Sequence, residues 1–346
     1  MAHILEEEVK RIVKLYGLDA DFVQNIGNVY RIYTNKGEFA LKRMKVENGL
    51  DFLYYMQFLY QRGYNRIVPI FPTADGRFAI LEGKYVYYLM PWLENKLKED
   101  HTQKHHDLFR ELARFHMLSV REVPVSKEER KEHFDRTQNR WEKEQEAMET
   151  YMEVSEKTWY MSPFQLMFCT FFSEISGGQR YALRKLNDWH EASLEETKAR
   201  SVIVHGKLST EHFLYNEKGI GYFSNFEKAS IASPIHDLLP FLSRMLNTHP
   251  KQFNESVEWL EAYFRHFPFK SEEMHLFLSY LAQPGPIYRV IEKYFSTTNE
   301  KNEMQFVRDL QRHYWQMKNK EFIVMRLNEI EERKKQMEQE QSHPSE

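Results

Sequence analysis

Two short stretches of the sequence hold side chains that could accept a proton or bind a metal ion. The first contains His205, Lys207 and His212, and the second contains Asn225 and Glu227. Imidazole and carboxylate groups act as acids and bases, and Mg²⁺ prefers oxygen ligands. A lysine ammonium is a cation at neutral pH and cannot accept a proton. The stretches therefore have the layout of an acid–base or metal site but few of its anions.

Lys42 is a further candidate because of the strand on which it lies. Residues 39–42 read Phe-Ala-Leu-Lys, and strand alternation puts Ala40 and Lys42 on one face. The segment resembles the kinase Val-Ala-Ile-Lys pattern, and this resemblance implies that the ammonium reaches into a cleft beside a small residue that admits an adenine ring. The helix that follows should supply an acid to pair with Lys42, and Glu47 and Asp51 are the candidates.

These segments resemble kinases of the aminoglycoside-phosphotransferase type. Such kinases carry His-Gly-Asp, an Asn five positions after that Asp, and later Asp-Phe-Gly or Asp-Phe-Glu. The equivalent positions here are Lys207, His212 and Asn225. The segment ending in Asp237 resembles the family's Asp-Pro-x-x-Asp-Leu, whose last Asp is structural. The resemblance covers roughly residues 20–300 in order and spacing.

The resemblance assigns a role to each position. The first Asp holds the substrate hydroxyl and accepts its proton, while the Asn and the second Asp hold magnesium on the nucleotide phosphates. Lys207 cannot act as that base, and losing a general base costs about 10²–10⁴ in rate. His212 suits softer metals than magnesium, and Asn225 offers a neutral carbonyl in place of a carboxylate. We expect a pseudokinase with degenerate phosphotransfer chemistry.

The predicted site follows from this correspondence. Lys207 and His205 take the catalytic positions, with His205 expected to be a structural histidine of the loop. The cofactor-binding positions are Lys42, His212, Asn225 and Glu227. No metal site and no bound cofactor are predicted. Between Gln24 and Val29 there is a single glycine, where a phosphate-covering loop needs several, which argues against tight nucleotide binding.

Other functions stay open at the level of sequence. In a rearranged site, Glu227 could hold a metal and Glu211 or His205 could act as base. The chain would then be an ATP- and Mg-dependent phosphotransferase acting on a sugar, amino alcohol or similar hydroxyl compound. A third alternative is a module that binds a nucleotide or metabolite without turnover, and a fourth is an unrelated helical protein.

A closer resemblance concerns residues 212–215, His-Phe-Leu-Tyr, and residues 233–241, Ser-Pro-Ile-His-Asp-Leu-Leu-Pro-Phe. In these segments the chain is most similar to the kinase-like proteins of the bacterial endospore coat, the CotS and YutH group, and to YutH members above all. The resemblance implies a structural role in spore coat formation, with other spore coat proteins as partners. It also implies synthesis in the mother-cell cytoplasm and recruitment to the spore surface.

Composition narrows the classes of protein to which the chain could belong. The 346 residues are 42% hydrophobic, and 48 basic against 51 acidic residues give a net charge of −3, which does not suggest a nucleic-acid partner. The N-terminus lacks the pattern of a signal peptide. Cys169 is the single cysteine, so no intrachain disulfide can form. Residues 159–175 are apolar but too short and too interrupted to span a membrane.

Aromatic residues are frequent, with 20 Tyr, 25 Phe and 6 Trp. Aromatic side chains bury large areas in cores and in interfaces. The composition therefore predicts an aromatic-rich core, and the alternative is a surface that assembles with other proteins.

The expected fold is α+β, a bilobal protein-kinase-like fold with a small sheet-bearing lobe and a large helical lobe. The lobes are expected at residues 1–91 and 92–338, followed by a disordered tail at 339–346. The predicted strands are residues 29–34, 38–44, 67–71, 78–81 and 85–90. The predicted helices are residues 4–16, 49–62, 108–118, 127–157, 181–200, 238–246, 253–267, 272–282, 290–295 and 303–338.

Overall fold

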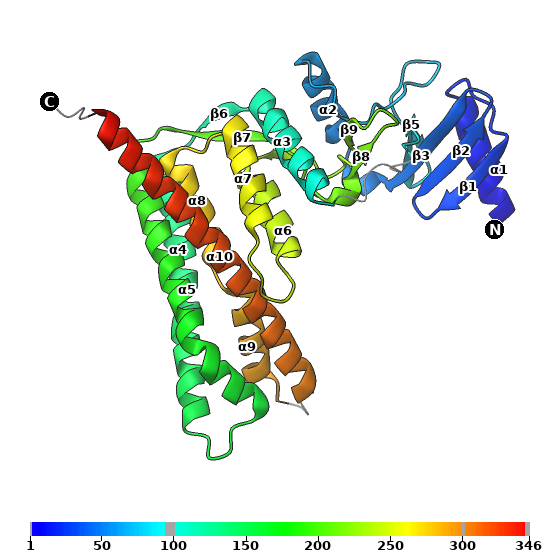
Figure 1. The fold of residues 1–346 in the computed structure, drawn as a ribbon. Coiled ribbons are helices and arrows are strands. Elements are labelled where there is room, and N and C mark those ends of the chain that lie inside the picture. Colours follow the sequence, from blue (N-terminus) through cyan, green and yellow to red (C-terminus); the bar gives the residue numbers. More distant parts are fainter. Residues whose placement is uncertain (1, 94–100, 299–301, 343–346) are drawn as a thin grey trace. The chain divides into compact units, whose positions relative to one another are not determined.

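The structure, a computed structural model, describes residues 2–93, 101–298 and 302–342 (Figure 1). By its internal contacts the chain divides into two compact units. Unit 1 comprises Met1–Val120 and Val202–Asp237, and unit 2 comprises Arg121–Ser201 and Leu238–Glu346. This is a different partition from the lobes expected at residues 1–91 and 92–338, which stay a prediction. An antiparallel sheet near the N-terminus and a largely helical remainder confirm the predicted α+β class.

Unit 1 contains a five-stranded antiparallel sheet in the order β1-β2-β3-β5-β4. Its strands are β1 (Phe22–Ile26), β2 (Val29–Thr34), β3 (Gly37–Lys45), β4 (Ile80–Glu82) and β5 (Tyr85–Pro91). The β2–β3 hairpin confirms the predicted pair. β1 was not predicted, because its sequence was interpreted as a loop leading into β2. Gly27 turns the chain between β1 and β2 with a positive φ of 71°, which glycine adopts without strain.

Helix α1 (Ala2–Lys14) covers one face of this sheet, as its apolar spacing predicts. Val9, Ile12 and Val13 are buried there in one cluster with residues of β2, β3 and β5, including Leu41. Side chains alternate along a strand, so Lys42 lies on the opposite face of the sheet. The core under α1 thus fixes which face of β3 carries the candidate lysine.

The rest of unit 1 contains the other candidate residues, namely His205, Lys207, His212, Asn225 and Glu227. It includes α2 (Asp51–Gln61), α3 (His101–Ser119), β8 (Phe213–Tyr215), β9 (Gly221–Phe223), β10 (Ser230–Ala232) and the end of β7 (Lys198–Val204). β10 pairs with β7 through Val202–Val204, and β8 pairs with β9.

The predicted strand at residues 67–71 is wrong. Only isolated bridges form there, from Ile67 to Phe223 and from Phe71 to Leu89. Pro69 and Pro72 lack the amide hydrogens that a continuous ladder needs.

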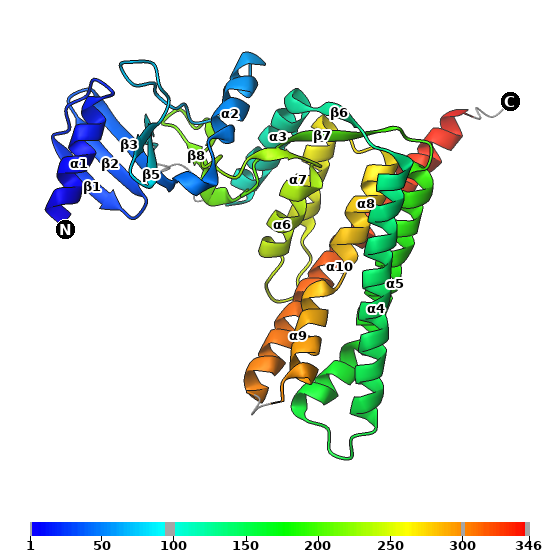
Figure 2. The ribbon, with the colours of Figure 1, turned by 180° about the vertical axis from the view of Figure 1, so that it is seen from behind.

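Unit 2 is built around a hairpin of two long antiparallel helices, α4 (Lys127–Glu156) and α5 (Pro163–Ser193), seen clearly in Figure 2. The predicted helix at 127–157 is confirmed. The predicted boundaries at 181–200 are wrong, because α5 begins at Pro163 and the chain enters β7 at Lys198.

The helices that follow in the chain are α6 (Ile235–Met245), α7 (Asn254–His266), α8 (Ser271–Ala282), α9 (Gly285–Ser296) and α10 (Glu303–Ser342). The short strand β6 (Arg121–Pro124) pairs with β7.

The core of unit 2 is rich in aromatic side chains, as the composition predicts. Phe164 stacks on Tyr294 with ring centroids 3.9 Å apart, and Phe171 stacks on Tyr314 at 3.6 Å. These contacts join α5 to α9 and α10. They also explain why residues 163–175 are helical, because Phe164, Phe168 and Ile175 are buried among other helices of the unit.

The last helix and the question of a membrane-spanning helix complete the description of the fold. α10 ends at Ser342 rather than near residue 338, and residues 343–346 of the predicted tail lie outside the described residues. Within the described ranges, no helix has both the length and the apolar character needed to cross a membrane.

Candidate functional site

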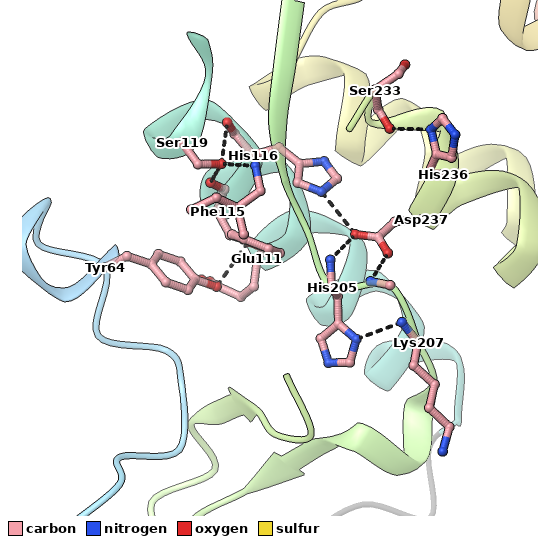
Figure 3. A network of polar contacts seen from close by, with 12 residues as sticks. Tyr64, Glu111, Phe115, His116, Ser119, His205, Lys207, Ser233, His236 and Asp237 are labelled. Atoms are coloured by element: carbon pink, nitrogen blue, oxygen red, sulfur yellow. Dashed lines mark hydrogen bonds and ion pairs between the residues drawn. The ribbon is translucent and has the colours of Figure 1, made fainter. Parts of the chain in front are cut away.

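All the candidate residues lie in unit 1, and Asp237 organises the first group of them (Figure 3). Its carboxylate accepts hydrogen bonds from the backbone amides of His205 at 2.7 Å and Gly206 at 2.9 Å. His116 Nε2 lies 3.2 Å from the same carboxylate. Burial would raise the pKa of Asp237, but His116 and His205 hold it below its ordinary value. Asp237 is therefore an ionised anchor for the loop that begins at His205.

His205 is fully buried and both of its ring nitrogens have partners. Nε2 lies 2.8 Å from the carbonyl oxygen of Ser224, and Nδ1 lies 3.3 Å from the amide nitrogen of Lys207. A carbonyl can only accept and an amide can only donate, so Nε2 carries the proton. Burial lowers the pKa of His205, which keeps the ring neutral. The ring therefore links two loops, as expected of a structural histidine.

Gly206 allows this loop to pass close to a neighbouring segment. Its φ is 72°, a left-handed conformation that side chains rarely adopt. A Cβ atom at this position would lie 2.1 Å from the carbonyl oxygen of Lys228. The loop geometry is thus possible only with glycine.

The second group forms a continuous hydrogen-bond chain. The Lys42 ammonium donates to Oδ1 of Asn225, and Nδ2 of Asn225 donates to Nε2 of His212 at 2.7 Å. Nδ1 of His212 then donates to the carbonyl oxygen of Lys207 at 2.8 Å. Because lysine can only donate, the amide orientation of Asn225 and the tautomer of His212 both follow. Burial lowers the pKa of His212, in keeping with a neutral ring.

Asn225 has a backbone conformation that suits a short polar residue. Its φ is 68°, and it is the one residue other than glycine with a positive φ in the described part of the chain. Asn and Asp tolerate this region better than most residues because their side chains can hydrogen-bond locally. Backbone outliers of this kind occur often at functional sites.

Lys42 also forms an ion pair with Glu227, and the Tyr88 hydroxyl donates to the same carboxylate. The side chains of Lys42 and Glu227 are 16% and 9% exposed. Burial would raise the pKa of Glu227, but the charge and hydrogen bond of Lys42 hold it below its usual range. The expectation that Glu47 or Asp51 would pair with Lys42 is therefore wrong, because the acid comes from the loop after β9.

The side chains at the predicted base positions lie elsewhere. Lys207 is exposed, and Figure 3 shows its side chain extending away from the His205 ring. Glu211 is also exposed, and its charge acts on Lys104 of α3. The structure thus brings Lys42, His212, Asn225 and Glu227 into contact with one another, but it does not bring the carboxylate of Glu211 into that group.

The donor set does not fit a magnesium ion. The lone pair of His212 Nε2 already accepts from Asn225, and the carboxylate of Glu227 is engaged by Lys42 and Tyr88. Magnesium requires several oxygen ligands in a nearly octahedral arrangement. No group of three or more His, Cys, Asp or Glu side chains able to hold a metal occurs within the described residues.

The sheet face beside Ala40 is occupied by other side chains. Arg31 lies directly opposite Ala40 in the β2–β3 register, so both are on that face. Its Nε donates to Glu38 at 2.7 Å, and its guanidinium lies 4.6 Å from the centre of the Trp92 ring. Trp92 is fixed in turn by its amide, which donates to the Glu38 carbonyl at 3.1 Å.

The space behind this network is also small. A cavity of about 10 Å³ lies among residues of α2, β5 and the loop after β9, including Phe52, Met90 and Phe226. A cavity needs roughly 10–15 Å³ to hold one water molecule. This cavity beside Asn225 is therefore about the size of one water molecule.

Sequence reasoning missed three residues that complete these networks, namely Tyr88, His116 and Arg31. Tyr88 and Arg31 are cross-strand neighbours of Lys42 and Ala40, so they follow only once the sheet register is known. His116 is four residues after Leu112 on the buried side of α3, and this helical spacing was the available signal.

Two solved structures that are similar to this chain are phosphotransferases. An aminoglycoside phosphotransferase from Alicyclobacillus acidocaldarius matches with a TM-score of 0.66 and 15% identity, over 93% of this chain and 95% of that one. Spectinomycin phosphotransferase APH(9)-Ia, in complex with ADP and spectinomycin, matches with a TM-score of 0.53 and 10% identity, over 91% and 98%. At these identities the likeness shows the fold, which confirms the predicted kinase-like architecture.

Sequence comparison gives the family. No relative was found among the curated proteins. A family model described as "Spore coat putative kinase YutH" matches residues 9–327, which includes both loops of the candidate site and all the strands of the sheet. The chain therefore belongs to the YutH family of kinase-like spore coat proteins.

Proposed function

We propose that this chain is a non-catalytic kinase-fold protein that acts structurally in spore coat formation. The observation that carries the proposal is the hydrogen-bond chain from Lys42 through Asn225 to His212. These are positions where the related kinases bind nucleotide phosphates and magnesium. Here each of these side chains forms a hydrogen bond with another side chain of the same protein. The site therefore stabilises the fold and does not bind a metal ion.

The proton-accepting step lacks a suitable group. Lys207 stands where the base would be, and it carries a positive charge at neutral pH. His205 has both ring nitrogens engaged and is 0% exposed, so it cannot reach a substrate hydroxyl. Glu211 is exposed, and its charge acts on Lys104. These placements support the loss of catalysis.

Nucleotide binding would have to displace existing contacts. The Lys42 ammonium would need to leave Asn225 and Glu227, and a base stacked at Ala40 would compete with Arg31 and Trp92. Breaking a buried ion pair typically costs several kcal/mol unless new partners replace the lost one. This competition supports the absence of a bound nucleotide.

The cellular role rests on the family. Membership of a spore coat family supports association with the coat, and other coat proteins are the proposed partners. We further propose synthesis in the mother-cell cytoplasm followed by recruitment to the spore surface. The intact anchor at Asp237 beside the altered catalytic positions is consistent with selection for the fold.

One observation favours a second candidate, a phosphotransferase with a rearranged site. Glu227 is a buried carboxylate near Lys42 with a lowered pKa, so it is an available anion if Lys42 turns toward a phosphate. It would then hold magnesium, and loss of activity in Glu227→Ala would be expected. A nucleotide- or metabolite-binding module without turnover would show binding but no product.

Thermal stability of the purified protein, measured with and without ATP and magnesium, separates these functions. A ligand at about 100 times its Kd stabilises the native state by about 2.7 kcal/mol. The proposal predicts no shift at millimolar nucleotide and no phosphotransfer to a mixture of hydroxyl compounds. A magnesium-dependent shift together with product formation, both abolished by Lys42→Ala, would refute it. A shift without product would indicate the binding module.

A further inference from the structure

The loop between α4 and α5 presents two aromatic side chains to solvent. Trp159 is 88% exposed and Tyr160 is 85% exposed, the highest values for large hydrophobic side chains among the described residues. Val154 in the last turn of α4 and Leu166 in the first turn of α5 are 48% and 60% exposed. Figure 2 shows this loop at one end of the helical hairpin. Exposed apolar groups gathered in this way mark interaction sites.

Hydrogen bonds anchor the two ends of the loop. Thr158 donates its hydroxyl to the Val154 carbonyl at 2.8 Å. Ser162 caps α5 and lies 2.7 Å from the Tyr294 hydroxyl, and the amide of Phe164 donates to Glu303 at 2.7 Å. Because α9 and α10 restrain the base of the loop, less backbone entropy is lost when Trp159 and its neighbour bind a partner.

The charged residues that flank the loop in the sequence are mostly acidic. Four exposed glutamates, at positions 146, 149, 153 and 156, lie on the last three turns of α4. From residue 146 to residue 166 the single basic residue is Lys157, which forms an ion pair with Glu153 at 3.3 Å. An acidic helix end next to exposed rings attracts cations, and a cation over a Trp or Tyr face is favourable.

We propose that the aromatic tip, defined as Trp159 and Tyr160 with Glu149, Glu153 and Glu156, binds a lysine- or arginine-rich segment of a partner protein. The cations of that segment lie over the two rings and pair with the carboxylates. This deepens the proposed structural function, on which it rests, by naming the chemistry of the partner. Anionic lipids and nucleic acids are repelled by the same carboxylates, so a basic protein segment is the occupant that the charge selects.

The direct test measures binding of a fluorescently labelled peptide of alternating arginine and glycine to the full-length protein by anisotropy. The wild type should bind, and the double variant Trp159→Ala with Tyr160→Ala should bind at least about 30-fold more weakly, the loss typical of an aromatic hot spot. Tyr54→Ala is the matched control, because Tyr54 is 63% exposed on α2 and should leave binding unchanged.

A second pair of variants tests the charges. Glu149→Lys with Glu153→Lys should weaken binding about tenfold and reduce its dependence on salt. Glu258→Lys with Glu261→Lys is the control, because both residues are exposed glutamates on α7. All substituted positions are exposed, and thermal denaturation of each variant checks that its fold is intact.

Several outcomes would overturn the proposal. They are no binding of the arginine peptide, undiminished binding in the aromatic double variant, and equal binding of a peptide of alternating glutamate and glycine. Capture of the protein by anionic lipid vesicles through Trp159 and Tyr160 would assign the tip to a membrane surface. Self-association abolished by the same double variant would assign it to a second copy of this chain. Nucleotide-dependent stability is unaffected by these variants, so failure here is distinct from failure of the proposed function.

Discussion

Single residues of the anchor around Asp237 determine how the loop at His205 is held. The Asp237 carboxylate is 1% exposed and meets three donors, so its removal takes away the acceptor that these donors share. We predict that Asp237→Ala lowers the free energy of unfolding by about 3–5 kcal/mol. Urea denaturation measures this loss. His236→Ala, at the neighbouring exposed position, should change stability by less than about 0.5 kcal/mol, and an equal loss in both variants would contradict the anchor.

Gly206 permits a second test at the same scale. Gly206→Ala should destabilise the protein by more than the roughly 1–3 kcal/mol of a strained backbone conformation, because its Cβ also meets the Lys228 carbonyl. Gly219 has nearly the same φ, 70°, but a Cβ added there would have no atom within 4 Å. The difference between Gly206→Ala and Gly219→Ala in chemical denaturation therefore measures the close contact. Equal losses would show that the contact is unimportant.

Some of the site residues could be predicted because their roles depend on local sequence. Lys42 follows from strand alternation, and Gly206 and Asp237 follow from the order of the resembling segments. The contact between Asn225 and His212 could not be predicted, since it depends on how two loops face each other. The pairing of Lys42 with Glu227 could not be predicted either, because the two residues are 185 positions apart in the sequence and come together only in the folded chain.

At the scale of elements, the starts of α4 and α5 offer a matched comparison. Both helices begin with a serine capping box, at Ser126 and Ser162. Ser126→Ala should lower stability by about 1 kcal/mol, the usual cost of losing an N-cap. Ser162→Ala should cost about 1 kcal/mol more, because Ser162 also hydrogen-bonds the buried Tyr294 hydroxyl. Thermal or urea denaturation of both variants gives the comparison, and a larger loss for Ser126→Ala would be inconsistent with it.

Elements with a strong local pattern were predicted, and those that depend on burial were not. α1 and the β2–β3 hairpin have clear periodicity and a turn, and both are confirmed. The first half of α5 has apolar residues on most sides, so its helical nature depends on packing between α9 and α10. Residues 67–71 look like a strand in composition, but their prolines prevent a ladder.

At the scale of the whole molecule, buried and half-buried histidines make stability depend on pH. Burial lowers the pKa of His133, His205, His212 and His313 below the ordinary value. Below about pH 6.5 the unfolded chain takes up protons at these positions that the folded chain does not bind. The free energy of unfolding should therefore fall as the pH is lowered from about 7.5 to about 5. Urea denaturation across this range measures the slope, and a flat profile would contradict it.

A single variant tests how much a histidine contributes to the pH dependence of the free energy of unfolding. His313 lies on α10 outside the candidate site, so His313→Asn should reduce the slope below about pH 6.5 without affecting the contacts of Lys42 and Asn225. Carboxylates with lowered pKa values, Asp237 and Glu227, contribute stability that is lost only at more acidic pH, as they become protonated in the folded state. The two effects therefore occupy separate pH ranges.

The hydrogen-bond chain through Asn225 also constrains how this chain can change during evolution. If Asn225 alone became aspartate, its carboxylate would face both Lys42 and His212, and the imidazole would take a proton to pair with it. The product would be a tighter ion cluster with Lys207 still in the base position. If the site is non-catalytic as proposed, this one substitution would not restore phosphotransfer, because Lys207 is a cation at neutral pH and cannot accept a proton. The hydrogen-bond chain thus couples these positions, so that a substitution at one of them changes the charge and the protonation of its neighbours.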